Sequence, residues 1–185
     1  MAFHPFRNSR LQSARLAAAQ LTALSDANRL AANGQALQAA PLFAQLAQEL
    51  EASGHPRRAA NLHTRAAHAF ADGGQEAAAL SHARAALNLF VQYAMEQRLQ
   101  QFYTNITRKL RVNGMTPAAE TLQHEFAAQV AGLPTPEPPT DSSRRGRLPG
   151  ACPKCAAPVH SDEVTWIDPH SAECPYCGTV LQTGP

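Results

Sequence analysis

The chain has few aromatic and few charged residues, and its four cysteines are confined to one end. Aromatic residues make up 6% and charged residues 16% of the 185 positions. Residues 1–131 contain no cysteine and so offer no nucleophilic thiol. No apolar run approaches the length of a membrane-spanning helix, and residues 1–10 lack the apolar core of a signal peptide. We therefore expect a cytoplasmic protein that does not interact with membranes.

A recognisable catalytic motif is also missing. No serine or threonine stands beside a plausible base in a known pattern, and no glycine-rich phosphate loop is present. Most of the histidines are scattered along stretches of helical composition, where we expect them on the surface: His55, His63, His68, His82 and His124. The sequence therefore favours a protein that is not an enzyme.

Composition divides the chain into three parts. Residues 1–131 are rich in Ala, Leu, Gln and Arg and poor in β-branched residues, a mixture that favours helix. Residues 132–150 hold several prolines followed by Ser, Gly and Arg, which predicts an extended, flexible linker. Residues 151–185 contain all the cysteines and form a segment too small to be stable on apolar burial alone. We expect metal binding to be coupled to the folding of this last segment.

The helical part repeats. Asn33-Gly34, Gly73-Gly74 and Asn113-Gly114 recur forty residues apart, where residues that tolerate a left-handed backbone end helices. Between them, apolar residues recur with helical spacing. The spacing predicts six helices, at roughly 9–32, 35–53, 56–72, 75–94, 99–110 and 116–131. Pro41 falls inside the second of these and is expected to kink it or to move its start.

Part of this region resembles tetratricopeptide-type repeats. In the segment Gly74–Leu87, Ala78 and Ala85 match that family's small residues seven positions apart, and Leu62, Ala66 and Gly73 fit its first helix and turn. The period here is forty residues rather than the family's 34. The resemblance implies three stacked antiparallel helix pairs with a concave face that binds a peptide or protein segment. An ordinary helical bundle is the alternative.

The cysteines occur as two pairs. Cys152-Pro-Lys-Cys155 and Cys174-Pro-Tyr-Cys177 are separated by eighteen residues. Each C-x-x-C turn aims two sulfurs at one point, and two such turns can supply the four thiolates of a structural Zn²⁺ site. We therefore predict one structural zinc ion with a filled coordination shell.

Other uses of the cysteines are weaker. Disulfides need an oxidising compartment, and a redox C-x-x-C motif is expected in a βαβ context, which this chain lacks. His160 and His170 lie between the two pairs, but a four-thiolate site needs neither.

Between and after the pairs, Val164–Ile167 and Thr179–Gln182 have the β-branched and apolar character of short strands. The C-P-x-C and C-P-x-C-G turns resemble zinc ribbons, which implies a small β module. The whole chain is thus expected to be mainly α with a small C-terminal zinc ribbon. Trp166, Pro175 and Tyr176 are candidates for an apolar contact with a partner.

The string Trp166-x7-Cys174-Pro-Tyr-Cys177 also resembles the C-terminal half of RING fingers. That resemblance implies that Trp166 and Pro175 dock a ubiquitin-like conjugating enzyme. The chain departs from RING fingers because it offers four cysteines where a RING uses eight ligands. Lys154 stands where RINGs place an apolar residue, and Gly178 where many place an arginine.

Charge separates the possible partners. Residues 1–131 carry twelve Lys and Arg against eight Asp and Glu, whereas residues 151–185 carry one lysine and four acidic residues. Phosphate backbones require clustered positive charge, so nucleic acid is the least favoured partner. We expect a non-catalytic adaptor that binds one protein through its helices and another through its zinc module. The alternative is a RING-like component of a ubiquitin ligase.

Overall fold

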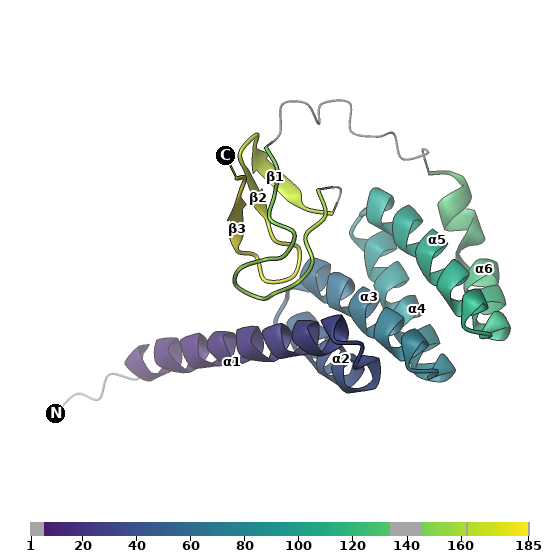
Figure 1. Ribbon diagram of the computed structural model, residues 1–185, viewed down its shortest axis with the longest axis horizontal. Helices are drawn as coiled ribbons and strands as arrows, with labels where there is room; N and C mark the ends of the chain where they lie inside the picture. The colour runs from purple at the N-terminus through teal and green to yellow at the C-terminus, as the bar shows by residue number, and fades with distance from the viewer. Residues whose placement is uncertain (1–5, 134–145, 162, 185) are drawn as a thin grey trace.

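Six helices and a small sheet make up the computed structural model, which describes residues 6–133, 146–161 and 163–184. Most of the predicted linker, residues 134–145, lies outside the described residues. The helices follow one another along the chain (Figure 1): α1 (Phe6–Ala32), α2 (Ala36–Ala52), α3 (Pro56–Asp72), α4 (Glu76–Gln92), α5 (Glu96–Val112) and α6 (Thr116–Ala131). The predicted helices are confirmed to within a few residues. Pro41 does not move the start of α2, which runs through it from Ala36.

The five turns between these helices share one backbone conformation. In the turn after α3, the Gly74 N–H donates to the Ala71 carbonyl (3.2 Å) and the Gln75 N–H donates to the Phe70 carbonyl (2.9 Å). This pair of bonds defines a helix C-terminus closed by a left-handed residue. The left-handed residues recur every twenty positions: Gly34, Gly54, Gly74, Ala94 and Gly114. The forty-residue recurrence in the sequence is therefore two helix-and-turn units.

Each helix packs against the next, and α4 also contacts α6 while α3 contacts α5. The contacts between alternate helices stack the hairpins into two layers, with α3 and α5 in one and α4 and α6 in the other. Small side chains allow this close approach, because α3 alone buries six alanines.

The C-terminal strands form one antiparallel sheet in the order β1 (Thr165–Asp168), β2 (Ser171–Glu173) and β3 (Val180–Gln182). Trp166 pairs with Ala172, which pairs with Leu181. Ala172 and Leu181 are buried, so this face of the sheet forms the inside of the module.

We refer to residues 146–184, which carry this sheet and the four cysteines, as the cysteine module. It lies over α1 and α3, on one side of the helices (Figure 1). Gly146 and Arg147 are part of it, because the Gly146 N–H donates to the Pro169 carbonyl (3.2 Å) and the Gly184 N–H donates to the Arg147 carbonyl (3.0 Å).

Within the part of the chain that the structure describes, two hydrophobic clusters form the core. One lies among α3, α4, α5 and α6. The other joins α1, α2 and α3 to the cysteine module, with Phe43, Leu46 and Leu62 in the same cluster as Tyr176 and Leu181. The module is thus packed onto the helices by apolar contact. Within the described residues, no helix has the length and apolar character needed to cross a membrane.

Candidate metal centre

Two tight turns present the four cysteines. In the first, the Cys152 N–H donates to the Ala157 carbonyl (2.8 Å) and the Ala156 N–H donates to the Cys152 carbonyl (2.9 Å). The second begins at the end of β2, where the Cys174 N–H donates to the Thr179 carbonyl (2.9 Å). Gly178 closes this turn at a φ of 74°, a conformation that favours glycine. Both turns thus fix the backbone on either side of a cysteine pair.

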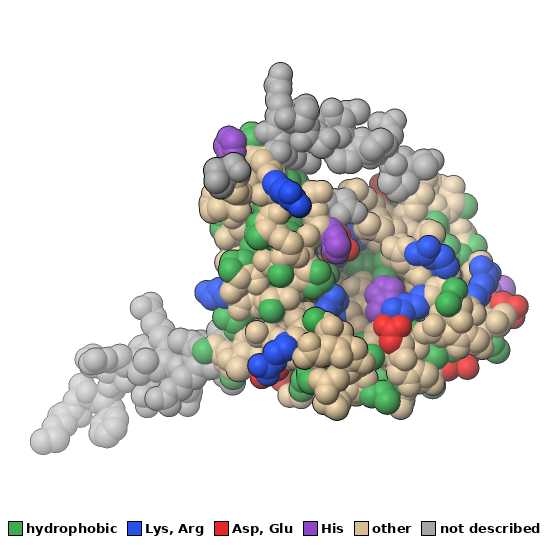
Figure 2. All heavy atoms as spheres, in the orientation of Figure 1, with side chains coloured by type: hydrophobic (Ala, Val, Ile, Leu, Met, Phe, Trp, Pro, Cys, Tyr) green, Lys and Arg blue, Asp and Glu red, His purple; other side chains and the backbone are tan. Residues whose placement is uncertain are grey.

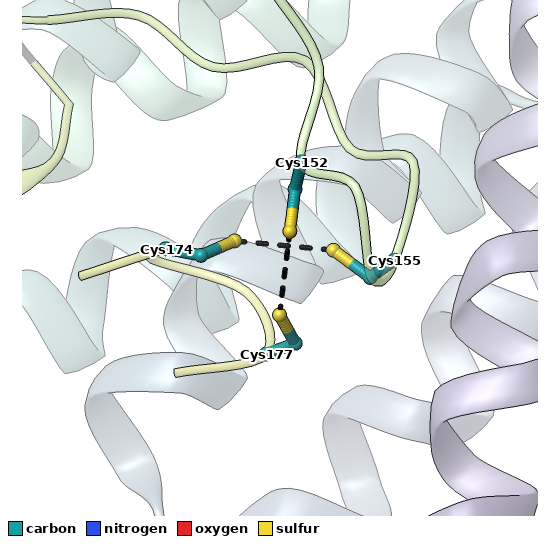
Figure 3. A group of neighbouring side chains, drawn as sticks. All are labelled: Cys152, Cys155, Cys174 and Cys177. Atoms are coloured by element: carbon teal, nitrogen blue, oxygen red, sulfur yellow. Dashed lines mark hydrogen bonds between the residues drawn. The ribbon is translucent and has the colours of Figure 1, made fainter. Parts of the chain in front are cut away.

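The four sulfurs converge on one point (Figure 3). All four Sγ atoms lie within 4.8 Å of one another, with 3.7 Å between Cys152 and Cys177 and 3.9 Å between Cys155 and Cys174. A tetrahedral metal with bonds of about 2.3 Å to sulfur needs sulfurs about 3.8 Å apart. A disulfide needs two sulfurs about 2.05 Å apart, and all four cysteines are free. The group therefore fits a metal ion and does not fit disulfides.

Burial also favours a closed metal centre. Cys152, Cys155 and Cys174 are at most 2% exposed, and Cys177 is partly buried. Among the described residues, the metal-ligand group at this point contains these four side chains and no other. His160 and His170 are exposed and lie outside it. Four thiolates fill a tetrahedral shell and leave no position for a substrate.

The sulfurs influence one another's protonation. Hydrogen bonds to Cys174 and Cys177, together with burial, raise the pKa of the Cys155 thiol. Hydrogen bonds from Cys155 and Cys174 lower the pKa of Cys177. Cys177 is thus the sulfur whose thiolate the cluster favours, and thiolate is the form of cysteine that binds metal.

Helix side chains hold the backbone of both cysteine turns. Asn28 on α1 donates from Nδ2 to the Cys155 carbonyl (2.9 Å). On α3, Asn61 donates from Nδ2 to the Pro175 carbonyl (2.8 Å), and Arg58 donates from Nε to the Tyr176 carbonyl (3.0 Å). Three carbonyls of the two turns are therefore bonded to side chains of the helices.

A second layer of contacts fixes these helix residues. Arg98 on α5 donates from Nη2 to Asn61 Oδ1 (2.6 Å) and also lies 3.6 Å from Glu163 Oε2. Tyr176 donates its hydroxyl to the same carboxylate (3.4 Å). Burial raises the pKa of Tyr176 to about 12, so its hydroxyl stays protonated as a donor.

The three predicted partner-contact residues differ in how far they are buried and in what they contact. Tyr176 is 4% exposed, and its ring lies against the Arg65 guanidinium at 5.9 Å. Pro175 is half-buried, with its carbonyl bonded to Asn61. Trp166 is half-buried on β1 and donates from Nε1 to the Ser161 carbonyl (3.1 Å). Pro175 and Tyr176 thus contact the chain's own helices.

Sequence reasoning missed Asn28, Arg58, Asn61 and Arg98. Asn28 and Asn61 are 2% and 4% exposed, although both are polar. Their signal in the sequence is an asparagine among the apolar residues of a helix. That signal indicates that the asparagine needs a hydrogen-bond partner, but it does not identify which residue the partner is.

The prediction that the helix histidines lie on the surface was wrong for His63. This side chain is 4% exposed between α2 and α4, with Nε2 3.0 Å from Glu51 Oε1 and Nδ1 2.8 Å from His82 Nδ1. Burial lowers the pKa of His63 and lowers that of His82 to about 4, so both rings are mainly neutral near pH 7.

Fold and site together describe a stack of helical hairpins with a four-cysteine module packed on one side. Comparisons with family models, with curated proteins and with solved structures found no match for this chain.

Proposed function

We propose that this chain is a non-catalytic adaptor of the cytoplasm, in which one structural zinc ion shapes a surface for protein contact. The observation that carries the proposal is the closed set of four sulfurs at most 4.8 Å apart, whose turns are bonded to Asn28, Arg58 and Asn61. Such a metal has no open position for chemistry, so its role is to hold backbone in place.

Zinc is the metal that best suits this donor set. Four thiolates in tetrahedral geometry are typical of Zn²⁺ and of iron–sulfur sites. Sulfur separations of 3.7 and 3.9 Å suit a single ion with bonds of about 2.3 Å. The two C-x-x-C turns beside a three-stranded sheet support a zinc ribbon.

The helices support the tetratricopeptide-like interpretation. Alternate helices contact each other, as in stacked helical hairpins, and five turns of one conformation separate them. The forty-residue period of a helix pair differs from the 34-residue repeat of that family. The resemblance therefore lies in the stacking of helical hairpins and not in the repeat length.

The RING-like alternative has less support. A RING uses two metal sites, whereas the described residues form one four-cysteine group. Pro175, a residue that would contact a conjugating enzyme, accepts a hydrogen bond from Asn61 through its carbonyl. The acidic character of the cysteine module gives little support to nucleic-acid binding.

Affinity purification tests the adaptor role. The tagged full chain and a Cys152→Ser/Cys174→Ser variant are used as paired baits, and captured proteins are then purified and titrated against each chain by calorimetry. We expect at least one partner to bind the intact chain directly and the variant at least about tenfold more weakly. If no captured protein binds directly, or if the variant has full affinity for all of them, the proposal fails.

A further inference from the structure

A groove of about 890 Å³ lies between the helices and the first cysteine turn. Its walls come from α1, α2, α3 and α5 on one side and from Gly150, Ala151, Ala156 and Pro158 on the other. Figure 2 shows a hollow between the cysteine module and the helices, with basic and histidine side chains near it. Two parts of the chain far apart in sequence thus form one concave surface.

The charge of the groove is unbalanced. Of the lining residues that the structure describes, Arg65, Arg108 and Lys109 stand against one carboxylate, that of Asp72. Lys109 pairs with Asp72 at 2.7 Å. Among the described residues, neither arginine has a carboxylate within 4.0 Å, in contrast to Arg84 and Arg98. The groove therefore carries two cations whose charge is not neutralised by the described part of the chain.

Arg65 is fixed by contacts with three side chains of the chain itself. Its guanidinium lies 5.0 Å from the centre of the Phe43 ring and 5.9 Å from that of Tyr176, and its Nη2 donates to Asn28 Oδ1 (2.8 Å). Its Nε is buried and has no hydrogen-bond partner within the described chain. A buried donor without a partner is costly, and a ligand oxygen that reached this atom would remove that cost.

His68 gives a second atom of this kind in the same groove. Its Nδ1 is buried and has no partner among the residues that the structure describes, and its ring meets Phe102 edge to face at 5.4 Å. Burial lowers the pKa of His68 to about 4, helped by the nearby Lys109 and Arg65 and opposed by Asp72. Near neutral pH the ring is therefore uncharged and able to hydrogen-bond either a donor or an acceptor.

We propose that this groove binds an acidic, extended segment of a partner protein, with a carboxylate placed at Arg65 and Arg108. The inference rests on the adaptor function and specifies the chemistry of its partner. A guanidinium fork matches the planar carboxylate, and Ala69, Val112 and Pro158 supply apolar contacts for the rest of a peptide. A nucleic acid would need a longer run of cations than the groove offers.

One wall of the groove depends on the metal centre. Ala151 and Ala156 stand next to Cys152 and Cys155, so an ion bound by this turn would also order the wall. Binding of the acidic segment and binding of the metal therefore support each other, and each raises the affinity of the other.

The test uses a fluorescent peptide of six glutamates, blocked at both ends, titrated against the full chain at low salt by anisotropy. Arg108 is exposed, and among the described residues its side chain donates one long hydrogen bond, to Asn105 Oδ1 on the same helix (3.5 Å), so Arg108→Glu should keep the fold. We expect this variant to bind at least about tenfold more weakly, equal to about 1.4 kcal/mol. Arg111→Glu, on the same helix and outside the groove, is the matched control and should change affinity less than about threefold.

A gain of affinity provides an independent check. Asp72→Asn removes the carboxylate that lines the groove and frees Lys109, so it should tighten binding, whereas Glu120→Gln on α6 should not. Removing the metal with a chelator should abolish tight binding. A six-lysine peptide and a six-nucleotide dT strand should bind at least about tenfold more weakly than the glutamate peptide.

The proposal is overturned if the glutamate peptide does not bind or if Arg108→Glu and Arg111→Glu weaken its binding equally. It is also overturned if the dT strand binds more tightly than the glutamate peptide. The adaptor function is judged separately, by the calorimetric titration of purified partners. A partner that binds wild type and Arg108→Glu with equal affinity leaves the adaptor function standing and overturns the groove as its site.

Discussion

Asn28 and Cys155 lie 127 positions apart in the chain and are joined by a hydrogen bond of 2.9 Å from the asparagine Nδ2 to the cysteine carbonyl. The same asparagine accepts a hydrogen bond from Arg65 through its Oδ1. A single buried amide thus connects the first cysteine turn to Arg65, one of the cations of the groove. We therefore expect a change in the order of the cysteine turn to affect Arg65 through this residue.

The first prediction concerns Asn61, which bonds to both Pro175 and Arg98. Asn61→Ala leaves a carbonyl and a guanidinium without their partner and should lower the free energy of unfolding by about 1–3 kcal/mol. Urea unfolding measures the change. Asn88→Ala, at an exposed position on α4, is the control and should change stability by less than about 0.5 kcal/mol. Equal effects of the two substitutions would show that Asn61 does not hold the module.

The second prediction concerns removal of the metal. Chelation, or Cys174→Ala, should release the cysteine module, which then becomes sensitive to protease. Far-ultraviolet circular dichroism should keep most of its helical signal, because a separate cluster joins α3 to α6. The melting temperature of the helices should still fall, since α1, α2 and α3 share a cluster with the module. An unchanged melting temperature would contradict this shared core.

The third prediction is a loss of stability in mild acid. Burial lowers the pKa of His68 and of His82 to about 4, below the usual value of 6.5, so the unfolded chain takes up these protons first. Their contribution to stability is complete above pH 6.5 and is lost as the pH falls toward 4. His68 contributes a slope of at most about 1.4 kcal/mol per pH unit in this window, and the more exposed His82 contributes less because of solvent screening.

Urea unfolding between pH 7 and pH 4.5, with metal content followed in parallel, measures this slope. A His68→Gln/His82→Gln variant should show a shallower dependence on pH than the wild type. The same slope in both proteins would contradict this assignment.

The fourth prediction concerns the turn at Ala94, which has a φ of 50° where the other four helix turns use glycine. A residue with a Cβ is strained in this conformation, so Ala94→Gly should stabilise the chain by about 1 kcal/mol. Gly74→Ala should destabilise it by a similar amount, and since a Cβ there meets no atom within 4 Å, the effect comes from the backbone alone. Thermal unfolding measures both. A loss of stability in Ala94→Gly would contradict the shared turn geometry.

The local parts of this structure could be predicted from the sequence. Apolar residues repeated with helical spacing and glycines at the turns located the helices, because both signals depend on neighbours along the chain. The spacing of Cys152, Cys155, Cys174 and Cys177 also predicted their convergence. Each turn is short and brings its own two sulfurs together, and one metal ion with four ligands needs both pairs.

The long-range contacts could not be predicted. Asn61 lies 37 positions from Arg98 and 114 from Pro175, and no local pattern connects them. The turn at Ala94 has no glycine at its left-handed position, so the sequence gives no signal for it. His63 resembles a surface residue in the sequence because its partners, Glu51 and His82, belong to two other helices.

Metal content per chain, measured by mass spectrometry on the folded, reduced protein, tests the central claim most directly. We predict one zinc ion in the intact chain and none in the Cys155→Ser variant. The substitution removes a sulfur that lies 3.9 Å from the Cys174 sulfur in the wild-type chain. A metal-free wild-type protein whose cysteine module still resists protease would contradict the account.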